Sequence, residues 1–555
     1  MFHVLSVVLL ALAWLVPNHY APWSTVYSDA VAALALLFFS LANGRATVER
    51  AAPIAVWVVC AVALIPAAQW VTGVLDFSGD AFVSVLYIIA FASSISIGHA
   101  AANRNPGTAA THLALAVVLG ALISSALAFN QALDVGGLGL WIANLPPGGR
   151  AFANLAQPNN LATLLGFGAI GLLTLREQRR LGSLSSALML CVLVLAAGLT
   201  QSRVALLFAP IIACGVWVSS KRGCKFRTSP LAILVAGVGH WVVAWNWPTV
   251  QTTLLLDATA PLADRALQSA RFHIWQILLD AVSRSAWQGY GWLQVGAAEL
   301  AVAKDHPPVG EMWLHGHNVF LEFLIWCGVP LGLTLIGLVL YWFTTRAAKI
   351  QTKEAVAAFL SLCVLGAHAL VELPHHYAFF LIPAGLWVGQ IESSLKAFGP
   401  INAKWNLLPQ ALALTLTICV LKDYAAVEDD SRLLRFETFR IGELRAKEPA
   451  PDAPFLSTLT AFLRFSRMQP RSGMSATELN EAEAITKRYP YALSLSRYAE
   501  MLALNGRLPE AIGSFESVRH MYSPSTYANL RRELQHHIDD GQVGLTPLAR
   551  ALSIR

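Results

Sequence analysis

Apolar residues gather along most of this chain in runs that suit membrane-spanning helices, which need roughly 20 mostly apolar residues each. About thirteen such runs are present, and they predict helices near residues 2–16, 26–43, 52–68, 81–100, 111–131, 159–175, 182–199, 203–219, 229–245, 318–342, 355–371, 377–394 and 405–421. The pattern breaks at 246–317, which is predicted to be a long polar loop, and again after 421. We therefore predict an all-α, polytopic helical bundle with about 12 to 13 transmembrane helices.

The same pattern divides the chain into four regions. They are an N-terminal transmembrane region (1–245), a large loop (246–317), further transmembrane helices (318–421) and a soluble helical domain (422–555). In the last region, the Gly, Ala, aromatic and Pro placement between Tyr498 and Pro524 is typical of a tetratricopeptide-like helix pair. Stacked repeats usually need about three units. A helical domain packed on the outer membrane face is therefore an equal alternative.

Composition supports the membrane setting. The 555 residues are 56% hydrophobic and 13% charged, with a mean hydropathy of +0.54, whereas soluble chains carry about 25% charged residues. The seven cysteines lie in apolar runs or near basic connections, and neither a disulfide framework nor a zinc spacing is apparent. We expect no metal and no cofactor.

The distribution of Lys and Arg predicts the orientation, because short cytoplasmic loops are enriched in both. The basic residues of one alternate set of connections are Arg45, Arg50, Arg104, Arg176, Arg179, Arg180, Lys221, Arg222, Lys225, Arg227, Arg346, Lys349, Lys353, Lys396 and Lys404. The opposite set holds essentially Arg150 and Arg203. This bias predicts a cytoplasmic N-terminus, with the His315–His317 loop and the C-terminal domain outside. The net charge of +6 then reflects topology, and we expect no nucleic-acid partner.

The first apolar run is interpreted as a retained helix. It lacks both the basic start and the small-residue cleavage site of a signal peptide, and it ends at Pro17-Asn18-His19-Tyr20.

Two arginines are candidates for binding phosphate. Arg203 follows Thr200-Gln201-Ser202 on the outer side, where the charge rule disfavours Arg. A guanidinium is always charged and offers a planar fork to phosphate oxygens, although a snorkelling Arg that binds lipid headgroups would fit the same position. Arg271 lies one helical turn before Trp275. This spacing suits a phosphate contact beside an interfacial aromatic, or equally a solvated loop charge.

His317 is the candidate base, because histidine titrates nearest physiological pH. His273, His306 and His315 compete for this role in the same loop. Position favours His317, since Asn318 and Glu322 continue it directly into a helix. The next outer turn carries His368, Glu372 and Tyr377 among further polar residues. These either support His317 or cap two helices.

Several of these segments together resemble a known family. Pro17-Asn18-His19-Tyr20-Ala21-Pro22-Trp23 with Asp29, and the run 149–163 that contains Asn154, Gln157 and Asn159, resemble PglL-type protein O-oligosaccharyltransferases, the pilin glycosylation ligases. Ser202-Arg203, Arg271 with Trp275, His317-Asn318 and the 368–377 turn resemble the wider superfamily of O-antigen ligases and Wzy-type polymerases. The resemblance covers nearly the whole chain. Asn160 stands where histidine is common, and Arg284-Ser285-Ala286-Trp287-Gln288-Gly289 lacks an expected proline.

The resemblance implies a GT-C-like inner-membrane enzyme of a Gram-negative bacterium, with its active-site loop in the periplasm. Such an enzyme transfers an oligosaccharide en bloc from undecaprenyl pyrophosphate to Ser or Thr of an exported protein such as a pilin, with inversion and without a metal. His317 would be the base, and Arg203, Arg271 and Arg150 would bind the pyrophosphate. Supporting roles fall to His19, Trp23, Asn154, Gln157, Asn159, Asn318, Glu322, His368, Glu372 and Tyr377. The amides near Pro158 also suit helix capping.

Two other functions remain open. An O-antigen ligase or glycan polymerase would use the same donor with lipid A core or another glycan as acceptor. A lipid-linked glycan transporter would predict charges deep in several helices and weak internal repeats. The charges here concentrate at one outer face.

Overall fold

A computed structural model describes residues 1–17, 19–43, 52–260, 271–393, 407–439, 441 and 449–553. Within these ranges the chain is helical, with one isolated backbone bridge between Gly310 and Tyr522 and no extended strand. The predicted all-α fold is therefore confirmed. Some residues used in the predictions lie outside the described ranges, namely Asn18, Arg45, Arg50, Lys396 and Lys404.

Each of the predicted apolar runs contains a helix. The helices are α1 (Phe2–Ala13), α2 (Val26–Asn43), α3 (Ile54–Val71), α4 (Ser78–Arg104), α5 (Pro106–Ala132), α6 (Pro158–Glu177), α7 (Ser183–Thr200), η2 (Val204–Leu207) with α8 (Phe208–Lys221), α9 (Pro230–Thr253), α13 (Val319–Lys349), α14 (Lys353–Ala369), α15 (Ala378–Glu392) and α16 (Leu407–Thr438). In the described parts of the chain, eight are long and apolar enough to cross a membrane, and α1, α2 and α15 are shorter apolar helices. The orientation, which rests on about thirteen spans, remains a prediction.

The chain forms two compact units. Unit 1 consists of Met1–Leu64, Leu86–Ser269 and Val339–Leu421, and unit 2 consists of Ile65–Val85, Ala270–Leu338 and Lys422–Arg555. Each unit thus combines segments that are far apart in the sequence. The four regions predicted from the sequence are instead continuous stretches of the chain, and they remain a prediction.

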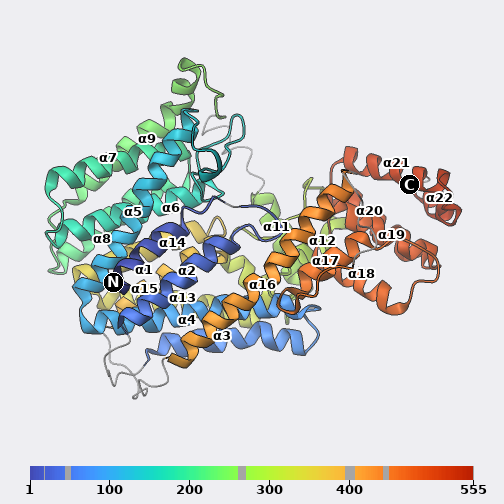
Figure 1. Cartoon of the computed structure of the whole chain (residues 1–555), viewed down its shortest axis with the longest axis horizontal. Coiled ribbons are helices and arrows are strands. Elements are labelled where there is room, and N and C mark those ends of the chain that lie inside the picture. The colour runs from blue at the N-terminus through green and yellow to red at the C-terminus, as the bar shows by residue number, and fades with distance from the viewer. Residues whose placement is uncertain are drawn as a thin grey trace. The chain divides into compact units, whose positions relative to one another are not determined.

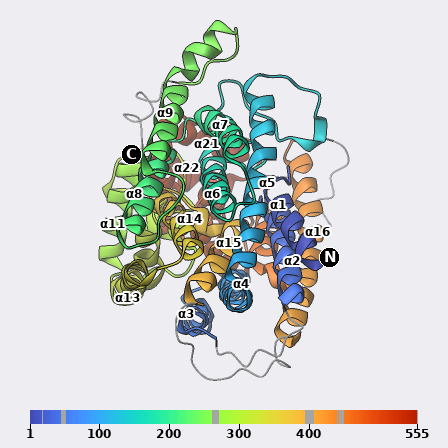
Figure 2. The same ribbon diagram turned by 90° about the vertical axis from the view of Figure 1, so that its left-hand side faces the viewer.

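Unit 1 is built on close helix packing. The helices α5 and α6 run side by side, as do α1 and α2 (Figures 1 and 2). Small residues permit close approach between α4 and α15. A Cβ added at Gly98 would lie 2.3 Å from the backbone oxygen of Leu386, and one at Gly389 would lie 2.1 Å from that of Ile95. Such small-residue contacts are a common way for membrane helices to pack without a hydrophobic driving force.

Unit 2 contains the C-terminal helices α17 (Ser457–Arg467), α18 (Ala476–Arg488), α19 (Ala492–Leu504), α20 (Leu508–Met521), α21 (Pro524–Asp539) and α22 (Thr546–Ser553). Their core includes fully buried Met501, Phe515 and Val518. The predicted helix pair is present, because α19 and α20 pack against each other across the turn at Gly506. A buried ion pair between Arg488 Nε and Asp80 Oδ2, at 2.7 Å, joins the end of α18 to the beginning of α4.

The segment predicted as a polar loop contains several helices. The helix α9 continues to Thr253, and α11 (Arg271–Arg284) and α12 (Val295–Val302) follow. The buried residues of α11 include Ile274, Ile277, Leu278 and Ala281. These positions recur every three or four residues, which is the pattern of an amphipathic helix. A search for continuous apolar runs misses such a helix, because polar residues of its other face interrupt the run.

Candidate active site

Predicted residues of unit 1 meet at the turn that carries Arg203. The helix α7 ends at Thr200, and Gln201 adopts a left-handed conformation with φ of 47°. Ser202 Oγ then donates to Asn159 Oδ1 at 2.7 Å, and Asn159 Nδ2 donates to Glu372 Oε1 at 2.9 Å. This chain of hydrogen bonds fixes the residue before Arg203 to the beginning of α6 and to the turn after α14. Sequence reasoning had not assigned a role to Ser202.

His368 lies inside unit 1, fully buried near the end of α14. Its Nδ1 is 2.8 Å from the hydroxyl of Thr163 on α6. The hydrogen bond joins two packed helices. Nearby, Asn160 is buried and donates to the backbone oxygen of Leu155 at 3.0 Å. The residue that departs from the family pattern therefore stabilises the turn before α6.

The N-terminal motif contacts the run at 149–163. His19 Nε2 is hydrogen-bonded to the backbone oxygen of Asn154. The buried Asn154 side chain donates to the backbone oxygens of Leu15 and Trp141 and accepts from the N–H of Ala143. These contacts hold the two segments together. His19 and Asn154 therefore stabilise the packing of these two segments.

Asp29 connects this motif to the 368–377 turn. Its Oδ2 accepts from the hydroxyls of Thr25 and Tyr87, each at 2.6 Å, and its Oδ1 accepts from the N–H of Ala378 at 2.7 Å. Ala378 is the first residue of α15 and Tyr377 is the residue that precedes the helix. An anion is favourable at this position because the first N–H groups of a helix lack partners within it.

The other predicted residues of unit 1 are Trp23, Gln157 and Arg150, and all three are half-buried. The indole ring of Trp23 stacks on Tyr87 with centroids 6.2 Å apart. Gln157 directly precedes α6, although its side chain makes no capping hydrogen bond there. Arg150 is half-buried in the connection before α6.

In unit 2, the loop that carries His317 is held from both sides. Trp275 Nε1, one turn into α11 from Arg271, donates to the backbone oxygen of Gly316 at 2.9 Å. The fully buried carboxylate of Glu322 accepts from the N–H of the same Gly316 at 2.8 Å. The loop backbone just before His317 is therefore fixed by two residues that the sequence had singled out.

His317 itself adopts a left-handed conformation with φ of 49°. Such a conformation is uncommon for a residue with a side chain and is maintained only where the surroundings require it. Asn318 Oδ1 accepts from the N–H groups of Phe320 at 3.0 Å and Leu321 at 3.1 Å, which caps the beginning of α13. The imidazole makes an edge-on contact with the ring of Trp313, with centroids 4.9 Å apart.

Glu299 of α12 was not predicted from the sequence. It is buried, and its Oε2 accepts from the N–H of Trp313 at 2.8 Å. Burial raises the pKa of Glu299 to about 8, and the neighbouring Glu311 acts in the same direction. The available signal was a lone acid within the otherwise apolar Val295–Val302 helix.

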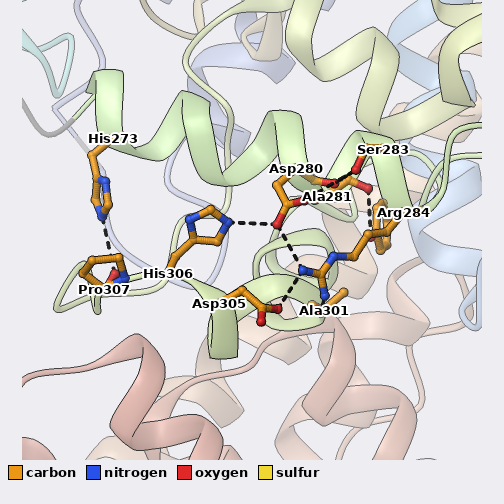
Figure 3. A network of polar contacts seen from close by, with 10 residues as sticks. His273, Asp280, Ala281, Ser283, Arg284, Ala301, Asp305, His306 and Pro307 are labelled. Carbon is orange, nitrogen blue, oxygen red and sulfur yellow. Dashed lines mark hydrogen bonds and ion pairs between the residues drawn. The ribbon is translucent and has the colours of Figure 1, made fainter.

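Two histidines that competed with His317 are engaged elsewhere on the loop (Figure 3). His306 Nε2 is hydrogen-bonded to Asp280 Oδ2 at 2.9 Å, and His273 Nε2 lies 3.4 Å from the backbone oxygen of Pro307. The hydrogen bond from His306 lowers the pKa of Asp280 below its usual range. Arg284 completes the network by bridging Asp280 and Asp305. The network thus fastens α11 to the segment 305–307.

The predicted residues therefore form two sets. Asn159 and Glu372 meet beside Ser202 and Arg203 in unit 1, where His19 also meets Asn154. Arg271 and Trp275 share a helix in unit 2, where His317, Asn318 and Glu322 lie on the adjoining loop and helix.

Comparison with known proteins tests the family resemblance inferred from the sequence. A model described as O-Antigen ligase matches residues 186–336, and one described as Virulence factor membrane-bound polymerase, C-terminal, matches 356–535. The chain is 28% identical over 532 residues to a General O-oligosaccharyltransferase of Acinetobacter baylyi, which covers 92% of this chain and 90% of the relative. It is 26% identical to a ComP-specific O-oligosaccharyltransferase of the same organism, over 75% of each chain. The resemblance to the superfamily of O-antigen ligases and Wzy-type polymerases is therefore confirmed.

Within that superfamily, the resemblance to protein O-oligosaccharyltransferases is confirmed, since both relatives carry that description over most of the chain. This chain is therefore a glycosyltransferase of protein O-glycosylation. Its many apolar helices also make it a multi-pass membrane protein.

Proposed function

We propose that this enzyme transfers an oligosaccharide en bloc from undecaprenyl pyrophosphate to a Ser or Thr hydroxyl of an exported protein such as a pilin. The observation that carries the proposal is the geometry of His317. It sits in a left-handed conformation directly before the capped α13, on a loop fixed through Gly316 by Trp275 and Glu322. A strained polar residue on a rigid support is typical of functional sites.

His317 acts as the general base in this mechanism. It takes the proton from the acceptor hydroxyl as that oxygen bonds to the anomeric carbon of the glycan. The bond between this carbon and the pyrophosphate oxygen breaks, and the pyrophosphate leaves as an anion. Attack from the face opposite the leaving group inverts the anomeric centre. A positioned base contributes about 100- to 10,000-fold to the rate.

Arg203, Arg271 and Arg150 stabilise the negative charge of the leaving pyrophosphate. Guanidinium groups suit this task because they remain charged and bind phosphate oxygens in pairs. In a site that excludes part of the water, their effect on a developing charge is enhanced. The arginines take the place of a cation, so the mechanism requires no metal. The hydrogen bonds from Ser202 through Asn159 to Glu372 support this role, because they restrain the turn that carries Arg203.

The proposed setting is the inner membrane of a Gram-negative bacterium, with His317 and the C-terminal helices in the periplasm. The charge bias of the short connections supports this orientation. We also assign acceptor binding to the C-terminal helices α17 to α22. They belong to the same compact unit as the His317 loop, and the N–H of Gly310 donates to the backbone oxygen of Met521 at 2.9 Å.

The decisive experiment measures the intact mass of a pilin that is co-expressed with the enzyme and a lipid-linked glycan in cells without another ligase. We expect a mass shift of one whole glycan, which is lost in His317→Ala and in Arg203→Glu. His306→Ala and Arg180→Glu are the matched controls and should retain the shift. Full transfer by His317→Ala at normal protein levels would remove His317 from the mechanism. Unmodified pilin with newly glycosylated lipopolysaccharide would assign the acceptor to lipid A core instead.

A further inference from the structure

Unit 1 contains a cavity of about 160 Å³ that takes no part in the proposed transfer. It lies among the beginning of α1, the end of α4, the beginning of α5 and the last turns of α15. None of the residues proposed to bind the donor or to act as base lines it. All four of these helix ends are on the side that the Lys and Arg distribution predicts to be cytoplasmic.

The polar groups of the cavity favour an anion. Arg104, the last residue of α4, lines it and is exposed, and the guanidinium has no ion-pair or hydrogen-bond partner among the described residues. His3 and His112 also line the cavity and stack on each other with ring centroids 4.4 Å apart. No Asp or Glu of the described chain contributes to the lining.

Gln390 provides an independent indication that a ligand is bound. Its side chain lines the cavity, the residue is only 4% exposed, and Nε2 is buried without a hydrogen-bond partner in the described chain. His3 Nδ1 is likewise buried without a partner. A buried polar group without a hydrogen-bond partner destabilises the fold. A ligand with acceptor oxygens would remove this destabilisation.

The rest of the lining is apolar and includes Phe39, Leu113 and Leu386. A free inorganic anion gains nothing from such a wall, whereas an acyl chain does. Basic pockets between membrane helices on the cytoplasmic side are suited to anionic lipid headgroups, and that leaflet is rich in anionic lipids. We propose that this cavity binds the phosphodiester headgroup of an anionic phospholipid, with Arg104, His3 and Gln390 as its polar contacts.

The test uses the purified full-length protein in detergent and needs no glycan donor, so its result is independent of the proposed transfer reaction. Native mass spectrometry measures retained adducts of palmitoyl-oleoyl phosphatidylglycerol and of the matching phosphatidylcholine. Thermal unfolding is recorded with each lipid and with inorganic phosphate. We expect preferential retention of phosphatidylglycerol and a higher unfolding temperature with this lipid alone.

Arg104→Gln should weaken the retention of phosphatidylglycerol at least fivefold, because it removes the cation at an exposed position where the fold does not depend on it. Arg180→Gln, another exposed arginine on the predicted cytoplasmic side, is the control and should bind as the wild type does. Gln390→Leu tests the buried contact and should weaken retention as well. Equal retention of the two lipids, or unchanged retention in Arg104→Gln, would overturn the proposal. Stabilisation by inorganic phosphate equal to that by phosphatidylglycerol would assign the cavity to a free anion and overturn the lipid assignment.

Discussion

The carboxylate of Asp29 accepts a hydrogen bond from the N–H of Ala378 at 2.7 Å, although the two residues are 349 positions apart in the sequence. The contact joins the first turn of α2 to the beginning of α15. It therefore connects the N-terminal motif to the turn near residue 377 within unit 1. The remaining oxygen of Asp29 binds two hydroxyl groups, so the whole carboxylate is used.

Asp29→Ala should therefore lower stability strongly. The substitution leaves buried donors of Thr25, Tyr87 and Ala378 without an acceptor, and each such group costs about 1–3 kcal/mol. Asp29→Asn should be milder, because its Oδ1 still accepts from Ala378. Thermal unfolding of the purified protein, followed by tryptophan fluorescence, measures the difference. Asp429→Ala, at a position with an exposed side chain, is the control. An unchanged unfolding temperature in Asp29→Ala would show that the contact is not required.

Asn159→Asp should reduce glycan transfer at least tenfold. The new carboxylate would face Glu372, where the amide now donates at 2.9 Å, and two like charges at that distance repel each other. The repulsion should loosen the turn that carries Ser202 and Arg203. Ser202→Ala removes one neutral hydrogen bond and should reduce transfer only a few-fold.

Initial rates of pilin glycosylation at several donor concentrations measure both effects, with the exposed Ser183→Ala as control. We expect the loss in Asn159→Asp to appear in the use of the donor. Wild-type rates in Asn159→Asp would show that catalysis does not depend on this chain of hydrogen bonds.

Trp313→Ala should lower kcat about tenfold and leave the unfolding temperature nearly unchanged. The half-buried indole ring holds the imidazole of His317 by an edge-on contact at 4.9 Å, and such aromatic contacts contribute about 0.5–1.5 kcal/mol. Trp313→Phe should recover most of the rate because it retains an aromatic ring. Single-turnover kinetics with a preformed complex of enzyme and donor measures the rate of glycan transfer directly. The highly exposed Trp287 provides the control substitution Trp287→Ala.

Glu299 should make stability depend on pH. Its pKa is raised by burial to about 8, so the folded protein binds a proton that the unfolded chain releases at about 4.5. The protonated form stabilises the fold at low pH, and this contribution is lost as the pH rises from about 4.5 to about 8. Glu299→Gln keeps the acceptor oxygen for Trp313 and cannot ionise. Glu299→Gln should therefore remove this part of the dependence of stability on pH.

Unfolding temperatures between pH 5 and pH 9 distinguish the variants. The difference between Glu299→Gln and the wild type should increase with pH, in favour of the variant. Glu481→Gln is the control and should follow the wild type. Parallel curves for Glu299→Gln and the wild type would show that the carboxyl group is ionised throughout this range.

The sequence predicted the membrane helices because continuous apolar runs are a local signal. It did not predict α11 and α12, since α11 is amphipathic and α12 has only eight residues. The end of α16 was also missed, because the helix continues beyond its apolar part to Thr438.

Within the candidate site, single residues were easier to predict than their partners. Arg203 and His317 stand out because charge and histidine are unusual at such positions. Ser202 and Glu299, by contrast, are identified only by contacts between separate segments, namely Ser202 with Asn159 and Glu299 with Trp313. Neither contact leaves a spacing that can be read along the chain.

The hydrogen bond between Gly310 and Met521 uses only backbone atoms. Substitution of a side chain at Met521 does not remove the acceptor, since every residue type offers the same carbonyl oxygen. The exposed surfaces of α18 to α22 can therefore diverge from one relative to another while this connection to the loop persists. Insertions or deletions near residue 521 would break it. Relatives that lack this hydrogen bond should therefore differ in the length of the chain near residue 521, more than in residue type.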